Sequence, residues 1–154
     1  MLKRDKSVML THFIVRACYF LLAAAAIALP FIVYDGMFGI TGEIKTYVIA
    51  AFYAVVPAGF AALIALDKLL VNIRKDIVFD SKNISLLRLI SYLCIYAGCV
   101  GLIAFIVISA VFRFIFETMI ILSIGEFFMA LVVRVVKNIF DAAIKFKEEN
   151  ELTI

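Results

Sequence analysis

Residues 46–66 are TYVIAAFYAVVPAGFAALIAL, a run of 21 residues without Asp, Glu, Lys or Arg. A bilayer crossing needs about 20 apolar residues, because an α-helix rises about 1.5 Å per residue and the hydrocarbon core is about 30 Å thick. The whole chain of 154 residues has the same character, with 66% hydrophobic and 18% charged residues. A soluble domain has about 45–50% apolar and about 25% charged residues. The composition therefore excludes a soluble enzyme domain and predicts an integral membrane protein.

Three further apolar runs complete the pattern and predict an all-α fold, with the whole chain forming a single membrane domain. The stretch from Leu86 to Val136 is 51 residues long and exceeds one crossing, so we place a turn near Ser109 to Glu117. Asp80, Ser81 or Asn83 can cap the helix that follows the longest polar connection. The predicted spans cover about residues 10–34, 46–67, 86–109 and 117–137, followed by a tail over 138–154.

Basic residues indicate how these spans are oriented, because Lys and Arg in short loops accumulate on the cytoplasmic side. Of the 15 Lys and Arg residues, only Lys45 and Arg113 fall on one side of the membrane, and the other 13 fall on the opposite side. We therefore expect both termini to be cytoplasmic and the tail to be a helical extension of the fourth span. A cleaved signal peptide at the N-terminus is the alternative. Cleavage would leave three spans whose positive loops no longer alternate, so four spans fit the charges better.

Small residues suggest where the helices approach one another, since helices in lipid associate through such residues. They recur at helical spacing in the second and third spans, at Ala54, Ala58, Ala61 and Ala65 and at Ala97, Gly101 and Ala104. We interpret these stripes as packing within the protein, and a homo-oligomer contact is the alternative. Pro57 removes one backbone hydrogen bond and is expected to kink the second span.

Glu126 is the main intramembrane polar candidate, because a carboxylate in hydrocarbon is costly and usually faces a helix, a cavity or a partner. It lies eight residues after Thr118, or about 12 Å along the helix and close to the bilayer midplane. One interpretation is a proton or cation site. The other is a hydrogen bond that orients two helices.

Arg16 and Arg88, together with Arg134, lie near the cytoplasmic border, where long side chains extend to the headgroups. They could also surround an anionic headgroup. We favour their extension to the headgroups, and a pairing of Asp67 with Arg16 or Arg88 is the alternative; we interpret His12 as an interfacial polar residue.

Catalytic motifs for hydrolases, metalloproteases and nucleotide-binding enzymes are missing from the sequence, and the predicted spans contain no Asp apart from Asp67 at the very end of the second. One His and three separated Cys residues provide neither a metal-ligand pattern nor a disulfide framework. We therefore expect no enzymatic activity, no cofactor and no metal, and basic residues at membrane borders give no reason to expect direct nucleic-acid binding.

The tail has an apolar stripe at Val135, Ile139, Ala143 and Phe146, which predicts an amphipathic helix. This helix can lie on the membrane surface or bind a protein. Leu152 and Ile154 end the chain beside three acidic residues, and we expect them to dock near Arg74, Lys75 or Lys82 of the cytoplasmic connection or of a second subunit.

Two segments carry a resemblance to a known family: LVVRVVKNIFDAAIKFKEENELTI over residues 131–154, above all its end KEENELTI, and FDSKNISLLRLISYL over residues 79–93. They resemble the YoaS-like family of small bacterial four-helix membrane proteins, a domain of unknown function. The resemblance implies a multi-pass protein of the bacterial inner membrane, often encoded beside a small helix-turn-helix regulator, and implies no activity.

The leading hypothesis is a non-enzymatic regulatory or sensory membrane protein that acts through cytoplasmic contacts with that regulator. The alternative is a small transporter, ion pathway or export-linked immunity factor centred on Glu126. A structural subunit of a larger membrane complex is a third hypothesis.

Overall fold

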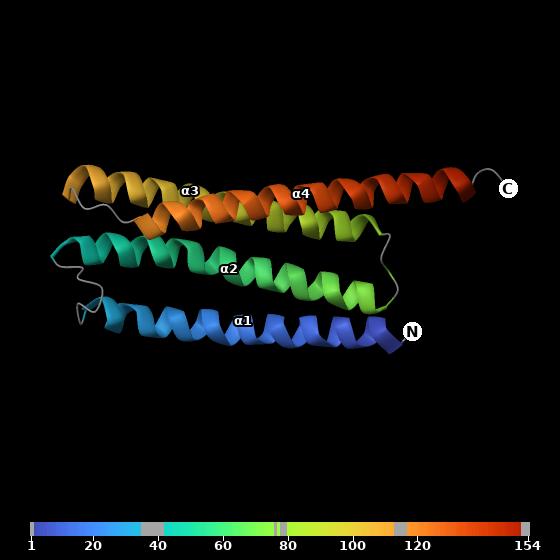
Figure 1. Cartoon of the computed structure of the whole chain (residues 1–154), viewed down its shortest axis with the longest axis horizontal. Helices are drawn as coiled ribbons and strands as arrows, with labels where there is room; N and C mark the ends of the chain where they lie inside the picture. The colour runs from blue at the N-terminus through green and yellow to red at the C-terminus, as the bar shows by residue number, and fades with distance from the viewer. Residues whose placement is uncertain (1, 35–41, 76, 78–79, 113–116, 152–154) are drawn as a thin grey trace.

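The computed structural model describes residues 2–34, 42–75, 77, 80–112 and 117–151, and these residues form four long helices (Figure 1). Helix α1 runs over Leu2–Tyr34, α2 over Ile44–Arg74, α3 over Ser81–Phe112 and α4 over Glu117–Glu151. Each has the length and apolar composition needed to cross a membrane, which identifies a multi-pass membrane protein. The predicted spans each lie within one helix, and α3 and α4 are separate helices.

The helices are antiparallel, and α4 crosses in front of α3 in the view of Figure 1. Helix α1 packs against α2, α2 against α3, and α3 against α4. Among the described residues, no Cα atom of α1 comes within 8 Å of α3 or α4. The bundle therefore leaves one side of α1 and one side of α4 without a neighbouring helix.

The start of α1, the end of α2, the start of α3 and the end of α4 lie at one end of the bundle, which we call the basic end because 13 of the 15 Lys and Arg residues belong to the segments there (Figure 1). Helix α4 extends beyond the other helices at this end. The end of α1, the start of α2, the end of α3 and the start of α4 lie at the opposite end. There Lys45 Nζ donates a hydrogen bond of 2.9 Å to the carbonyl oxygen of Tyr34, one of the last carbonyls of α1.

Gly42, just before α2, has a φ of 65°, a left-handed conformation that glycine adopts without steric cost. Gly36 and Gly39, which precede it in the chain, lie outside the described residues.

Few of the described side chains are fully buried, as expected for a small group of helices surrounded by lipid. Ile108 and Val33 are the most buried large apolar residues, and Val48 packs with Ile108 in a small core that Ile44 and Met119 flank. Many large apolar side chains on α1 and α4 are instead exposed, Phe13, Phe20, Leu131 and Phe128 among them. This distribution suits a protein whose outer surface contacts hydrocarbon, since lipid is as apolar as these side chains.

Proline 30 lies inside α1, and its missing amide hydrogen leaves the carbonyl of Ala26, four residues earlier, without its usual helical donor. Tyr53 of α2 supplies a replacement, because its hydroxyl donates a hydrogen bond of 2.6 Å to the Ala26 carbonyl oxygen. Neighbouring helices are the normal means by which a membrane protein satisfies such groups. This contact therefore joins α2 to α1 at the point where the α1 ladder is interrupted.

Pro57 lies inside α2, which continues on both sides of it. The Tyr96 hydroxyl of α3 donates a hydrogen bond of 3.2 Å to the carbonyl oxygen of Ala54, in the turn that the proline ring disturbs. The expected kink at Pro57 stays a prediction. The α1 and α2 pair and the α2 and α3 pair therefore share one feature. In each, a tyrosine of the second helix donates a hydrogen bond to a backbone carbonyl in the turn before a proline of the first helix.

The start of α3 is fixed by its cap and by two asparagines. Asp80 Oδ1 accepts a hydrogen bond of 2.8 Å from the Lys82 amide, so Asp80 is the capping residue among the three candidates. Asn83 is fully buried, donates to the Ile77 carbonyl at 2.7 Å and accepts a bond of 2.7 Å from the Asn72 side chain. These bonds hold the end of α2 against the start of α3.

Candidate functional site

Glu126 lies near the middle of the apolar run of α4, Thr118 to Val133, in the interface with α3. Its side chain is half-buried and lies close to the thiol of Cys94 on α3. The carboxyl group is therefore turned toward a neighbouring helix, one of the three surroundings expected for a charged group in hydrocarbon.

The α3 to α4 interface is close because α3 presents small residues to α4. A Cβ atom on Gly101 would collide with Ser123 Oγ, so only glycine permits this approach. The Ser123 hydroxyl in turn donates a hydrogen bond of 2.8 Å to the Met119 carbonyl of its own helix. Further toward the basic end, the buried Ser91 hydroxyl donates a bond of 3.1 Å to the Ala130 carbonyl. These contacts fix the position of Glu126 relative to α3.

Glu126 also lines a groove of about 340 Å³ between α2, α3 and α4, with Leu29 of α1 at its edge. The small residues predicted as a packing stripe in the third span, Ala97, Gly101 and Ala104, line this groove. Its lining is mainly apolar, and Thr118 and Ser123 join Glu126 as polar members. Ligand pockets commonly have about 300–1,000 Å³ and a few polar groups in an apolar surface. The groove therefore has the size and character of a small-ligand site open to the membrane interior.

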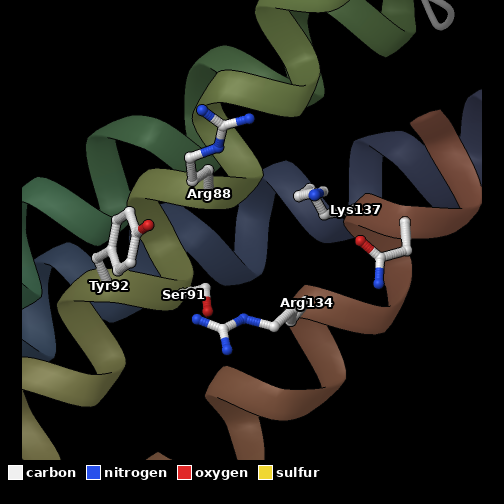
Figure 2. Close-up of a pocket in the computed structure, with 6 residues that line it drawn as sticks. Arg88, Ser91, Tyr92, Arg134 and Lys137 are labelled. Atoms are coloured by element: carbon white, nitrogen blue, oxygen red, sulfur yellow. The ribbon is translucent and has the colours of Figure 1, made fainter.

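The three arginines near the basic end are not gathered in one place. Arg16 is exposed on α1, which packs only against α2. Arg88 of α3 and Arg134 of α4 instead line one pocket of about 200 Å³, together with Ser91, Tyr92, Lys137 and Asn138 (Figure 2). In Figure 2 the Arg134 guanidinium extends toward Ser91, and Lys137 lies between the two helices. The structure therefore brings two of the three predicted arginines together and adds a lysine.

The alternative pairing of Asp67 with Arg16 or Arg88 was wrong. Asp67 pairs with His12, whose Nδ1 lies 3.2 Å from the carboxylate Oδ1. The physical reason is position, because α1 and α2 are antiparallel neighbours and His12 lies one turn before Arg16, level with the end of the apolar run of α2. His12 is thus part of an α1 to α2 contact.

The candidate partner-binding residues are partly described. Arg74 and Lys75 are exposed at the end of α2, and Lys82 is exposed in the first turn of α3. Leu152 and Ile154 lie outside the described residues, and α4 stays helical through Glu151. Docking of the last residues near this connection stays a prediction.

Within the described part of the chain, no group of three or more His, Cys, Asp or Glu side chains is placed to hold a metal ion. Cys18, Cys94 and Cys99 are free thiols.

Comparison with protein families finds a match over residues 19–154 to the family described as Protein of unknown function (DUF2975). The chain belongs to the DUF2975 family. The match includes all of α2, α3 and α4, so the Glu126 groove and the Arg88 and Arg134 pocket both lie in the part shared with the family. The family description assigns no activity. No curated protein and no solved structure matches the chain.

The sequence analysis did not predict that these basic residues form one pocket, although their spacing along the two helices contains a signal for it. Its residues follow the same spacing on both helices: Arg88, Ser91 and Tyr92 on α3, and Arg134, Lys137 and Asn138 on α4. Residues separated by three and four positions share one helix face. Such matched faces indicate a shared site only once the two helices are known to be antiparallel neighbours, and the sequence alone does not give that alignment.

Proposed function

We propose that this protein is a non-enzymatic regulatory or sensory protein of the bacterial inner membrane that acts through the cytoplasmic part of α4. The observation that carries the proposal is the continuation of α4 as a single helix to Glu151, beyond the end of its neighbour. Because Ser91 contacts Ala130 in an antiparallel pair, the start of α3 at Ser81 lies roughly beside Phe140. The last ten or so described residues of α4 therefore have no other described helix beside them.

The second half of α4 carries three large apolar side chains that are mostly exposed, and the last of them, Phe146, lies beyond the start of α3. Val135, Ile139 and Phe146 are 58%, 61% and 67% exposed, and their spacing of four and seven residues places them on one helix face. An amphipathic helix with such anchors is a common means of binding a protein partner. The helix continues in the direction of its membrane-spanning part, which favours a protein partner over a position along the membrane surface (Figure 1).

Orientation and context supply the rest of the proposal. The excess of Lys and Arg at the basic end supports cytoplasmic termini. The resemblance of the terminal segment to YoaS-like proteins supports a small helix-turn-helix regulator, encoded beside this protein, as the partner. Binding would hold that regulator at the membrane, so this protein contacts DNA only through it.

The experiment is co-purification of that regulator with the protein from detergent extracts. Full-length protein is expected to retain the regulator, and a chain ending at Asn138 is expected to lose it. A sharper pair of variants changes two residues each: Ile139→Gln with Phe146→Gln on the stripe, and Asp141→Gln with Glu148→Gln on the polar face. Loss with the stripe variant alone supports the proposal. Equal recovery with all variants would refute a role for the tail.

A transporter or ion pathway centred on Glu126 is the second candidate, and the groove favours it. A carboxyl group on a groove of about 340 Å³ within the membrane-spanning helices is a reasonable place for a proton or cation. Glu126→Gln should then abolish pH-dependent flux in liposomes, while Glu117→Gln, at the exposed start of α4, should not. The absence of flux with the unmodified protein would reject this candidate.

A further inference from the structure

The pocket between α3 and α4 at the basic end has the composition of an anion site. Arg88, Arg134 and Lys137 contribute three positive charges, and none of the described lining residues is acidic. Among the residues that the structure describes, none of these three side chains forms an ion pair, and the carboxylate nearest in sequence to Lys137, Asp141, pairs with Lys145 instead. Three cations held on one face without a carboxylate attract a negatively charged ligand.

Neutral groups in the same pocket complete the set of hydrogen-bond donors. Asn138 offers an amide and Tyr92 a phenol, and Arg88 and Arg134 each present the planar fork that matches the oxygens of a phosphate. Ser91 is already engaged, because its hydroxyl donates to the Ala130 carbonyl. That bond fixes the two helices at the pocket, so the basic side chains start from a defined backbone spacing.

The pocket lies at the depth of the lipid headgroups. Arg88 immediately precedes the charge-free run of α3 from Leu89 to Phe112, and Arg134 immediately follows the apolar run of α4 that ends at Val133. If Glu126 is near the midplane, Arg134 lies about 12 Å and Lys137 about 16 Å from it along the helix, and half of the hydrocarbon core is about 15 Å. The basic groups therefore lie at the boundary where lipid phosphates are found.

From these observations, we propose that this pocket binds the phosphodiester headgroup of an anionic membrane lipid. The volume of about 200 Å³ accommodates a phosphate with part of its glycerol, and it is smaller than most sites for drug-sized ligands. Basic pockets between membrane helices are known to hold such headgroups. A free phosphate ion has the same charge chemistry, but the headgroup is favoured because its acyl chains can lie along the exposed apolar faces next to the pocket, at Leu89 and Leu131. The proposal does not depend on a cytoplasmic regulator.

The experiment measures lipid binding by native mass spectrometry of the intact protein released from detergent. The probes are phosphatidylglycerol, zwitterionic phosphatidylcholine as the control lipid, and inorganic phosphate. The pocket variant combines Arg88→Gln, Arg134→Gln and Lys137→Gln. A matched variant combines Arg16→Gln, Lys68→Gln and Arg74→Gln, which removes three charges at the same end but outside the pocket.

The unmodified protein is expected to prefer phosphatidylglycerol over phosphatidylcholine by at least about tenfold, because each basic side chain near a membrane surface contributes roughly a fivefold factor. The pocket variant should lose most of this preference and the matched variant should keep it. Charge-preserving Arg134→Lys should also keep it, which separates lost charge from a folding defect.

Three results would overturn the proposal. The first is no preference in the unmodified protein. The second is equal loss in the pocket and matched variants, which would indicate diffuse attraction to the whole basic end. The third is displacement of the lipid by millimolar inorganic phosphate, which would assign the pocket to a free anion.

Discussion

Replacing Tyr53 by Phe tests whether a side chain of α2 satisfies the backbone of α1. The Tyr53 hydroxyl donates a hydrogen bond of 2.6 Å to the Ala26 carbonyl, whose usual helical donor is missing because residue 30 is proline. Ala26 lies eight residues inside the end of α1 at Tyr34, about 12 Å along the helix, where no water is present to replace the hydroxyl.

The expected cost of Tyr53→Phe is about 1–1.5 kcal/mol of folding free energy. A buried acceptor left without a donor costs about 1–3 kcal/mol in water-soluble proteins. Hydrogen bonds between membrane helices average about 0.6 kcal/mol and reach about 1.7 kcal/mol, because the unfolded chain in the membrane also finds partners. The upper part of the membrane range applies here, since the bond is short and proline removes the competing donor.

A second substitution isolates this cause. Pro30→Ala restores an amide that can donate to the Ala26 carbonyl within α1. In that background Tyr53→Phe should cost less than about 0.5 kcal/mol, so the double-mutant cycle should show a coupling of roughly 1 kcal/mol. Tyr19→Phe is the control, because its ring stacks on Phe60 with centroids 6.3 Å apart while its hydroxyl bonds to no other described residue.

The assay is reversible unfolding by sodium dodecyl sulfate in bicelles, followed by circular dichroism because the chain has no Trp. If Tyr53→Phe costs the same free energy in the unmodified protein as in the Pro30→Ala variant, the reasoning is refuted. The Tyr53 hydroxyl would then not be replacing the hydrogen bond that Pro30 removes from the Ala26 carbonyl.

Three further substitutions test the contacts that position the groove and the α2 to α3 connection, in the same unfolding assay. Gly101→Ala should destabilise the protein by about 1–3 kcal/mol, because the added Cβ would displace the buried Ser123 hydroxyl. Gly125→Ala is the control and should be tolerated, because no heavy atom lies within 4 Å of its added Cβ. Equal effects of the two substitutions would contradict the close approach of α3 and α4. Asn83→Ala should cost about 1–3 kcal/mol because it leaves an amide and a carbonyl unpaired, and a neutral result would show that these bonds contribute nothing net. Asp80→Ala should cost about 0.5–2 kcal/mol through loss of the α3 cap, and Asp80→Asn should restore most of it.

The number and type of helices could be predicted because hydrocarbon thickness fixes how many apolar residues a span requires. Residues 46–66 satisfy that requirement without any knowledge of their neighbours. The separation of α3 from α4 was also predictable, since 51 consecutive mainly apolar residues are too long for one helix in a bilayer.

The contacts between helices could not be predicted in the same way, because they depend on which helices are neighbours and on their relative shift. The small residues of α3 indicated a close approach, but not that Ser123 would occupy the space above Gly101. The sequence offered several basic residues as partners for Asp67. The antiparallel packing of α1 against α2 is what places His12 beside it. The sequence singled out Glu126 as a carboxylate in an apolar run, but its position beside Cys94 depends on the shift between α3 and α4.

The most direct test of the proposed regulatory role is photo-crosslinking in intact bacterial cells from Phe146, the most exposed member of the apolar stripe of α4. Phe146 would be replaced by the photoreactive residue p-benzoylphenylalanine, with Glu148 on the polar face replaced as the control. The account predicts an adduct with the small helix-turn-helix regulator from position 146 and much less from position 148. An adduct with periplasmic proteins, or with lipid alone, would contradict it.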